Sequence, residues 1–162
     1  GSAGFCGDRT PYTNTSGISG GGSGTTTTYY GAYLRLITNK SPIFECANDS
    51  DLYTTSGSSE GNKALIYPIG IISADEVTYA GGVWGTNNQS YYLYTILAYW
   101  TISPRNFAGS STYMFGVDSL GGLNSWDVYI TRGVRPVINL KADLQLSGSG
   151  TSSDPYVVEG AA

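Results

Sequence analysis

The clearest alternation of apolar and polar residues lies in the C-terminal half of the chain. Between positions 112 and 118, every second residue is large and apolar, as in a strand that buries one face: Tyr113, Phe115 and Val117. Similar stretches predict strands at 91–97, 99–103, 127–131 and 134–140, and a last pair around 144–146 and 156–158. Turns at 120–124 and 148–150 connect strands, the second closing the last pair into a hairpin. The pattern therefore predicts an antiparallel sheet.

A helix is predicted in the middle of the chain, where a capping box precedes it. The Ser73 hydroxyl can accept a hydrogen bond from the Glu76 amide, while the Glu76 side chain reaches back to the helix start. We expect the helix to run from Ala74 to about Ala80, to bury Val77 and Ala80, and to end at the two glycines that follow.

The N-terminal part of the chain has less regular patterns. Apolar residues spaced three and four apart between 29 and 37 favour a short helix ending near Asn39, although alternation in the same stretch also fits a strand. We expect 43–46 to pair as a short strand and the apolar run 64–72 to be buried extended chain, in which Pro68 disfavours a central strand position. The Gly/Ser/Thr stretch 13–28 predicts a long loop.

Length and composition fit one β-rich domain. A chain of 162 residues buries roughly 70% of its unfolded surface, enough for one core. Charged residues make up only 12% of the chain, while Gly, Ser, Thr, Asn and 14 Tyr favour strands and turns over helices. Together with the predicted helix, this indicates a single α+β, β-rich domain over 1–162, with Gly1 and Ser2 interpreted as a cloning scar.

Charge and hydropathy limit the classes of partner. The net charge is −4 and no segment concentrates Lys or Arg, so we expect no nucleic-acid partner. No apolar run approaches the roughly 18 residues that span a bilayer, so we expect no direct membrane insertion. No signal peptide stands at the front, which is consistent with a soluble fragment from which a signal, an anchor or a pilin-type helix has been removed.

The two cysteines favour a disulfide over a metal site. Cys6 and Cys46 lie 40 positions apart, with no CxxC pair and no His in the chain, which argues against zinc. A disulfide is the favoured interpretation, and two buried free thiols are the alternative.

The available side chains indicate binding and not catalysis. Without His, no Ser/His/Asp or Cys/His arrangement can form, so we predict no enzyme, no catalytic residue and no cofactor. Asp49 and Asp51 could hold calcium, but the string lacks the rest of an EF-hand loop, which favours a solvated loop and no metal site. Asp75 and Glu76 are explained by their position at a helix start.

Aromatic residues are the most informative candidates for binding. Trp and Tyr give large contact areas at low entropic cost, and Ser, Gly and Asn are adaptable hydrogen-bonding neighbours. Trp100, in an apolar stretch, is assigned to the core. Trp126 lies in a polar segment with no evident core partner, and surface recognition and a packing role both stay open for it.

Five segments together resemble one family of bacterial surface proteins. They read YWTISP at 99–104, GVRPVINLK at 133–141, FCGDR at 5–9, YPIGIISADE at 67–76 and GTSSDPY at 150–156. Many such proteins are pilin-like, and the pattern is similar to that of C-type-lectin-fold proteins of the formylglycine-generating-enzyme type. These include variable proteins that are diversified by diversity-generating retroelements. The resemblance covers nearly the whole chain.

The resemblance implies a C-type-lectin-like fold with a twisted antiparallel sheet, one or two short helices and long loops. It also implies that 134–140 is the core strand that fixes the scaffold and that the stretch before it carries the binding residues. The ligand-binding positions implied here are Met114, Asp118, Leu120, Leu123, Asn124, Ser125, Trp126, Asp127, Tyr129 and Thr131. In the predicted strands they lie on the face opposite Tyr113, Phe115, Val117, Val128 and Ile130.

Two departures limit what the resemblance implies. The chain lacks the Glu-Pro-Asn, Gln-Pro-Asp and Trp-Asn-Asp strings of calcium-dependent sugar-binding lectins, and both cysteines lie in the first 46 residues instead of near the C-terminus. We therefore expect an adhesin or receptor-binding domain displayed outside a bacterium, on its surface, a pilus or a phage. Its ligand would be a protein on another cell, a host or a phage. The alternative is a structural pilin-like subunit whose displayed face serves assembly.

Overall fold

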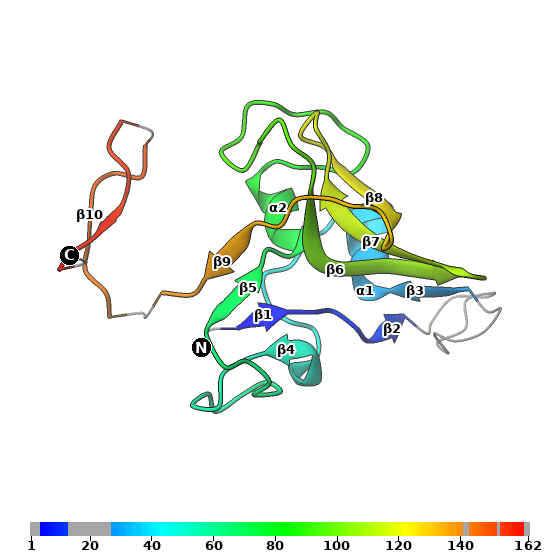
Figure 1. Cartoon of the computed structure of the whole chain (residues 1–162), viewed down its shortest axis with the longest axis horizontal. Helices are drawn as coiled ribbons and strands as arrows, with labels where there is room; N and C mark the ends of the chain where they lie inside the picture. Colours follow the sequence, from blue (N-terminus) through cyan, green and yellow to red (C-terminus); the bar gives the residue numbers. More distant parts are fainter. Residues whose placement is uncertain (1–3, 13–26, 141–142, 152, 161–162) are drawn as a thin grey trace.

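The computed structural model describes residues 4–12, 27–140, 143–151 and 153–160, and its centre is a five-stranded antiparallel sheet (Figure 1). The strand order is β2-β3-β6-β7-β8. The bounds are Pro11–Tyr12 for β2, Thr28–Tyr30 for β3, Tyr99–Ala108 for β6, Ser111–Val117 for β7 and Leu123–Asp127 for β8. Most of the predicted loop 13–28 lies outside the described residues. The described part is α+β and β-rich, as predicted.

Three two-stranded ribbons accompany the sheet. They pair β1 (Phe5–Cys6) with β4 (Leu52–Tyr53), β5 (Ile69–Ile71) with β9 (Pro136–Ile138), and β10 (Leu146–Ser147) with β11 (Val157–Val158). All three pairs are antiparallel. The last one confirms the predicted C-terminal hairpin, and its turn contains Gly148 and Gly150, both with positive φ.

The helices are short and lie in the N-terminal half. A helical segment starts as α1 (Gly31–Tyr33) and continues as the π-helix η1 (Leu34–Asn39), which confirms the helix predicted to end near Asn39. A single 3-10 turn, η2, covers Asp49–Asp51. The second α-helix, α2, runs from Ala74 to Ala80, as the capping box predicts.

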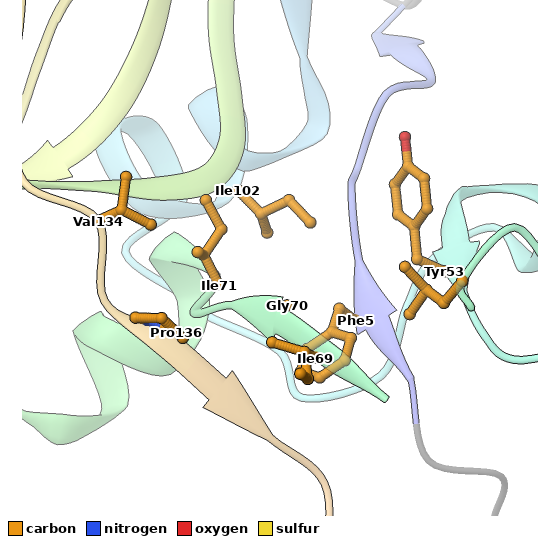
Figure 2. Close-up of a pocket in the computed structure, with 9 residues that line it drawn as sticks. Phe5, Tyr53, Ile69, Gly70, Ile71, Ile102, Val134 and Pro136 are labelled. Atoms are coloured by element: carbon orange, nitrogen blue, oxygen red, sulfur yellow. The ribbon is translucent and has the colours of Figure 1, made fainter. Parts of the chain in front are cut away.

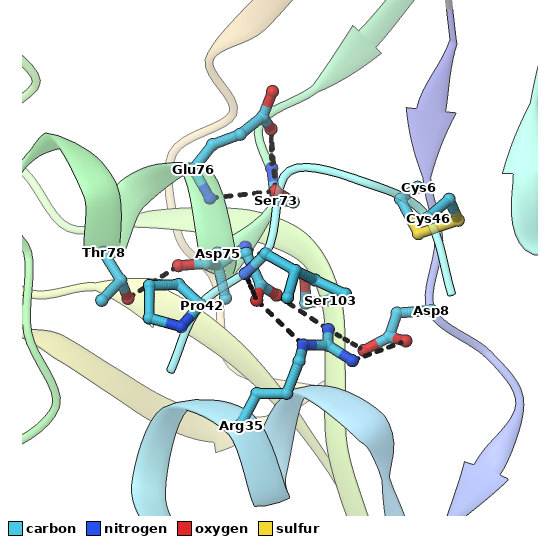
Figure 3. Close-up of polar contacts among 12 residues, drawn as sticks. Cys6, Asp8, Arg35, Pro42, Cys46, Ser73, Asp75, Glu76, Thr78 and Ser103 are labelled. Atoms are coloured by element: carbon cyan, nitrogen blue, oxygen red, sulfur yellow. Dashed lines mark hydrogen bonds and ion pairs between the residues drawn. A yellow bond between two sulfur atoms is a disulfide. The ribbon is translucent and has the colours of Figure 1, made fainter. Parts of the chain in front are cut away.

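The capping box at the start of α2 is complete (Figure 3). The Glu76 amide donates to Ser73 Oγ at 3.1 Å, and the Ser73 amide donates to Glu76 Oε2 at 2.8 Å. Val77 is fully buried, whereas Ala80 is only partly buried, because the helix ends there at Gly81. The predicted burial is therefore correct for Val77 and wrong for Ala80.

Replacing Ser73 with Ala is expected to lower the free energy of unfolding by about 1 kcal/mol, because the Glu76 amide loses its hydrogen-bond acceptor at the helix start. Urea unfolding followed by circular dichroism measures this difference. Thr78→Ala is the control for a hydroxyl removed from within the helix, since Thr78 Oγ1 donates to the carbonyls of Ala74 (2.9 Å) and Gly82 (3.3 Å) and not to the helix start. An equal loss in both variants would contradict a specific capping role.

The core lies between the helices and one face of the sheet. α2 packs against η1, β6, β7 and β8, and α1 packs against β6. The buried cluster consists of Ala32, Leu36, Ile72, Ala74, Val77, Tyr99, Phe115, Val117 and Leu123. Phe115 and Val117 are both fully buried, which confirms the predicted packed face of β7.

A buried ion-pair network joins the N-terminal segment to both helices. The Arg35 guanidinium, on η1, donates from Nη2 to Asp8 Oδ2 at 2.7 Å and to Asp75 Oδ2 at 2.8 Å, and from Nε to Asp75 Oδ1 at 2.9 Å (Figure 3). The Ile43 amide also donates to Asp75 Oδ1. The predicted disulfide between Cys6 and Cys46 is present beside this network, two residues before Asp8. Together they fix the first strand to the body.

Two predicted strands are absent because their residues form turns or irregular chain. The segment 91–97 turns at once, since the Tyr94 amide donates to the Tyr91 carbonyl, and Tyr91 packs on the glycines that end α2. The segment 43–46 is held by Asp75 and the disulfide instead of by a neighbouring strand. Aromatic and β-branched residues here serve side-chain packing and not strand pairing.

Three other predictions were wrong in extent. In the run 64–72 only Ile69–Ile71 is a strand, and Ile66 and Tyr67 are exposed, because this strand belongs to a two-stranded ribbon and not to the sheet interior. The strand predicted at 127–131 lies earlier, at Leu123–Asp127, and Val128–Ile130 form a turn. The scaffold strand implied at 134–140 shrinks to β9, which pairs with β5 outside the main sheet; Val134 and Ile138 are exposed.

Candidate binding surface

The position of the β7–β8 turn decides where the predicted binding residues lie. Asp118 Oδ1 accepts hydrogen bonds from the amides of Leu120 (2.9 Å) and Gly122 (3.0 Å), which closes the turn directly after β7. Gly121 has φ of 81°, and a Cβ there would lie 1.7 Å from the Asn88 carbonyl oxygen, so glycine is required. Strand β8 therefore starts at Leu123, whereas the sequence pattern predicts a turn through 124.

Leu123 is a core residue and not a binding residue. It is 1% exposed, pairs with Val117 and belongs to the buried cluster. Its inclusion among the surface positions was wrong, because the turn ends one residue before it and the strand then directs its side chain into the core.

The register of β8 divides the remaining candidates between the two faces of the sheet. Directly paired residues share a face, so Met114 and Trp126 lie together on the face opposite Phe115. This is the face predicted for Met114, whereas Trp126 lay outside the predicted strands. Ser125 pairs with Phe115 and Asp127 pairs with Tyr113, which places both on the core-facing side. For Asp127 the predicted face was wrong, whereas Ser125 lay outside the predicted strand 127–131 and had no predicted face.

A cluster of two tryptophans and an arginine occupies the face of the sheet opposite the core. We call it the Trp–Arg stack: Trp100 on β6, Trp126 on β8 and Arg132 after the following turn. The two indole rings meet edge to face with centroids 5.8 Å apart, and the Arg132 guanidinium lies 4.4 Å from the Trp126 ring centroid. Trp126 thus packs on the outer face and not in the core.

Gly116, on β7, lies between the two tryptophan side chains. It pairs with Trp100 on one side, and a Cβ at this position would lie 2.9 Å from the Trp126 ring and 2.6 Å from the Tyr99 carbonyl oxygen. Any larger residue would displace the indole of Trp126. The short side chain at this strand position is therefore what allows the rings to meet.

Exposed residues lie at both ends of β8. At one end, Leu120 projects from the β7–β8 turn beside a pocket of about 200 Å³, whose lining includes Trp84, Thr86, Asp118 and Asn124. At the other end, Tyr129 is 77% exposed and Thr131 is exposed. The structure therefore brings Asp118, Leu120 and Asn124 together at one end and Tyr129 and Thr131 at the other, with Trp126 between them on β8.

Sequence reasoning missed Trp100 and Arg132 as members of this surface. Trp100 was assigned to the core because its neighbours are apolar, yet Tyr99 is buried, and alternation along β6 then directs Trp100 to the other face. Arg132 has no such signal, because its position over Trp126 depends on the pairing of Tyr99 with Gly133.

Three carboxylates away from this surface, those of Asp49, Asp51 and Asp75, hold parts of the fold together. Asp51 is buried, with Oδ2 accepting from the Thr10 amide at 2.7 Å, and Asp49 Oδ1 accepts from the Gly61 amide at 2.8 Å. The segment forms the hydrogen-bonded turn η2, in which Asp49 is exposed, as expected for a solvated loop, and Asp51 is buried. Asp75 accepts hydrogen bonds from the Arg35 guanidinium. Within the described residues, no three His, Cys, Asp or Glu side chains gather in a way that could hold a metal ion.

A second surface feature, an apolar groove, was not predicted. It has a volume of about 440 Å³ and is lined by Phe5, Tyr53, Leu65, Ile69, Gly70, Ile71, Ile102, Val134 and Pro136 (Figure 2). The lining comes from the β1–β4 ribbon, the β5–β9 ribbon and β6, together with Leu65 and Val134 from irregular chain, and it has hardly any polar surface. Within the described residues, no helix is both long enough and apolar enough to cross a membrane.

Comparison of the chain with protein-family models, curated proteins and solved structures gave no match.

Proposed function

We propose that this protein is a C-type-lectin-like domain, displayed on a bacterial surface, that binds a protein ligand through the sheet face built on the Trp–Arg stack. The observation that supports it is the stack itself, in which two indoles and a guanidinium are packed together outside the core. The disulfide fits an oxidising, extracellular location. No catalytic arrangement is proposed.

The chemistry of the stack suits protein recognition. Trp, Tyr and Arg are the residues that most often dominate binding energy at protein interfaces. Here the cation already lies over the Trp126 ring, so little side-chain entropy remains to be lost when a partner binds. The exposed Tyr129 extends the same surface past the end of β8. A partner with apolar and acidic groups would match this combination.

Selection from a random displayed-peptide library, with the purified chain as the bait, tests the proposal. Peptides retained by the wild-type protein are expected to lose at least about thirtyfold in affinity for a Trp126→Ala, Tyr129→Ala double variant, because loss of a binding hot spot has effects of this size. Surface plasmon resonance measures the affinities. The double variant should keep its near-ultraviolet circular dichroism, apart from the lost aromatic signals.

The matched control is Tyr67→Ala, which removes an exposed tyrosine near β5, on a different element from the stack. Its affinity for the same peptides should equal that of the wild type. Peptides that bind the folded double variant as tightly as the wild type would overturn the placement of the recognition face.

A further inference from the structure

The C-terminal ribbon β10–β11, with the described residues of its connecting turn (148–151 and 153–156), forms an arm that stands clear of the body (Figure 1). Among the described residues, every hydrogen bond of 143–160 stays within that segment, for example from the Glu159 amide to the Gln145 carbonyl. No ion pair, ring contact or disulfide of the described residues joins it to the rest. Among the described residues, the arm is therefore joined to the body by no polar, ring or disulfide contact.

The arm is amphipathic. Leu146 pairs with Val158, and alternation places Leu144 and Tyr156 on the same face as this pair. The opposite face carries Gln145, Ser147 and Glu159, with Val157 among them. Leu146 is 45% exposed and Tyr156 is 64% exposed. An isolated two-stranded ribbon is marginally stable in water, so its apolar face needs a cover.

The body carries a surface of matching chemistry. The apolar groove described above is open to solvent, and the exposed side chains Ile69 and Val134 are part of its lining. Strands β5 and β9 form a sheet of only two strands in the described part of the chain, so each has an outer edge without a strand neighbour. An extended apolar segment could therefore pack in the apolar groove and pair with a free strand edge.

We infer that the arm of one copy seats its apolar face in the groove of a second copy. The groove volume of about 440 Å³ suits several apolar side chains, and the apolar face of the arm offers four. The occupant is therefore another copy of this chain, and the contact is heterologous because arm and groove are different surfaces.

The short segment between β9 and the arm disfavours binding of the arm in the groove of its own copy. The tether, residues 139–143, spans at most about 17 Å when fully extended. Its first residue is fixed, since Asn139 Nδ2 donates to the Gly4 carbonyl at 3.3 Å. The arm would have to reverse direction directly after β9 to reach the groove that Val134 and Pro136 line. A neighbouring copy removes this constraint.

Sedimentation velocity over a roughly hundredfold range of concentration tests the inference with the full chain. The wild type is expected to self-associate. Leu146→Asp on the arm and Val134→Asp in the groove should each weaken association by roughly thirtyfold or more, because each places a charge in an apolar contact. The controls are Ser147→Asp, on the polar face of the arm, and Ile96→Asp, an exposed apolar residue of the loop before β6; both should associate like the wild type.

Mixing the two defective variants gives the sharpest result. Leu146→Asp keeps an intact groove and Val134→Asp keeps an intact arm, so together they should form a one-to-one complex although each alone is a monomer. A wild type that stays monomeric at every concentration would overturn the inference. Two variants that form no mixed complex would also overturn it. So would an apolar dye that binds the groove equally well in the wild type and in Leu146→Asp at high concentration.

Discussion

Replacing Arg35 with Ala is expected to lower the free energy of unfolding by about 3–5 kcal/mol, the usual cost of removing one partner from a buried ion pair. Its side chain is 16% exposed, and the carboxylates of Asp8 and Asp75 are 7% and 6% exposed. Burial alone would lower the pKa of Arg35, but hydrogen bonds to Asp75 and Asp8 raise it above its ordinary value. The cation thus stays charged, and its loss leaves two buried carboxylates without a counterion.

The matched control is Arg9→Ala. Arg9 also pairs with a buried carboxylate, that of Asp51, but its side chain is 49% exposed and the Nε–Oδ1 distance is 3.5 Å. Such a pair contributes less than about 1 kcal/mol. Urea unfolding of both variants gives the comparison, and adding Asp8→Asn to Arg35→Ala should recover part of the loss, since it removes one uncompensated charge. Equal destabilisation by the two arginine substitutions would show that the network does not anchor the fold.

Reduction of the disulfide is expected to lower the free energy of unfolding by about 3–4 kcal/mol. The bond closes a loop with a sequence separation of 40, and its removal restores the conformational freedom of that loop in the unfolded chain. The Cys6→Ser, Cys46→Ser double variant should show the same loss. Urea unfolding with and without reductant measures both.

The double variant also provides the control for this second prediction. Reductant should leave its unfolding midpoint unchanged, because no thiol remains to react. The wild type should shift to the midpoint of the variant. A wild-type midpoint that does not respond to reductant under denaturing conditions would mean that the loop contributes no such constraint.

The parts of the fold that sequence predicts well depend on neighbouring residues. The capping box of α2 needs only Ser73 and Glu76, three positions apart, and local hydrogen bonding decides it. The packed face of β7 follows from alternation over seven residues. In both cases the residues that determine the structure are neighbours in sequence. Tertiary contacts therefore leave the locally predicted structure unchanged.

The errors at the candidate surface have a tertiary cause. The start of β8 is set by the Asp118 carboxylate and by the close approach of Gly121 to the Asn88 carbonyl, a contact between distant segments. Because β8 covers Leu123–Asp127, Leu123 lies in the core, and Asp127 lies on the core-facing side of the sheet, opposite to its predicted face. Alternation predicts a face correctly only when the turn that sets the register is known.

The apolar groove could not be predicted from local sequence patterns. Its lining comes from positions 5 to 136, and the exposed Ile69 and Val134 read as core residues in their local sequence. Only the pairing of β5 with β9, outside the main sheet, leaves them uncovered. Apolar runs indicate burial, and they do not distinguish burial in a monomer from burial against a partner.

The contact between the loop after α2 and the start of β8 has a consequence for solubility. β8 is the last strand of the main sheet, and an open edge of this kind can add strands from other molecules and lead to aggregation. Here Trp84 pairs with Leu123 in parallel, the Leu123 amide donates to the Val83 carbonyl, and the Gly85 amide donates to the Leu123 carbonyl. The loop therefore closes that end of the edge, and its detachment would expose a template for non-native strand addition.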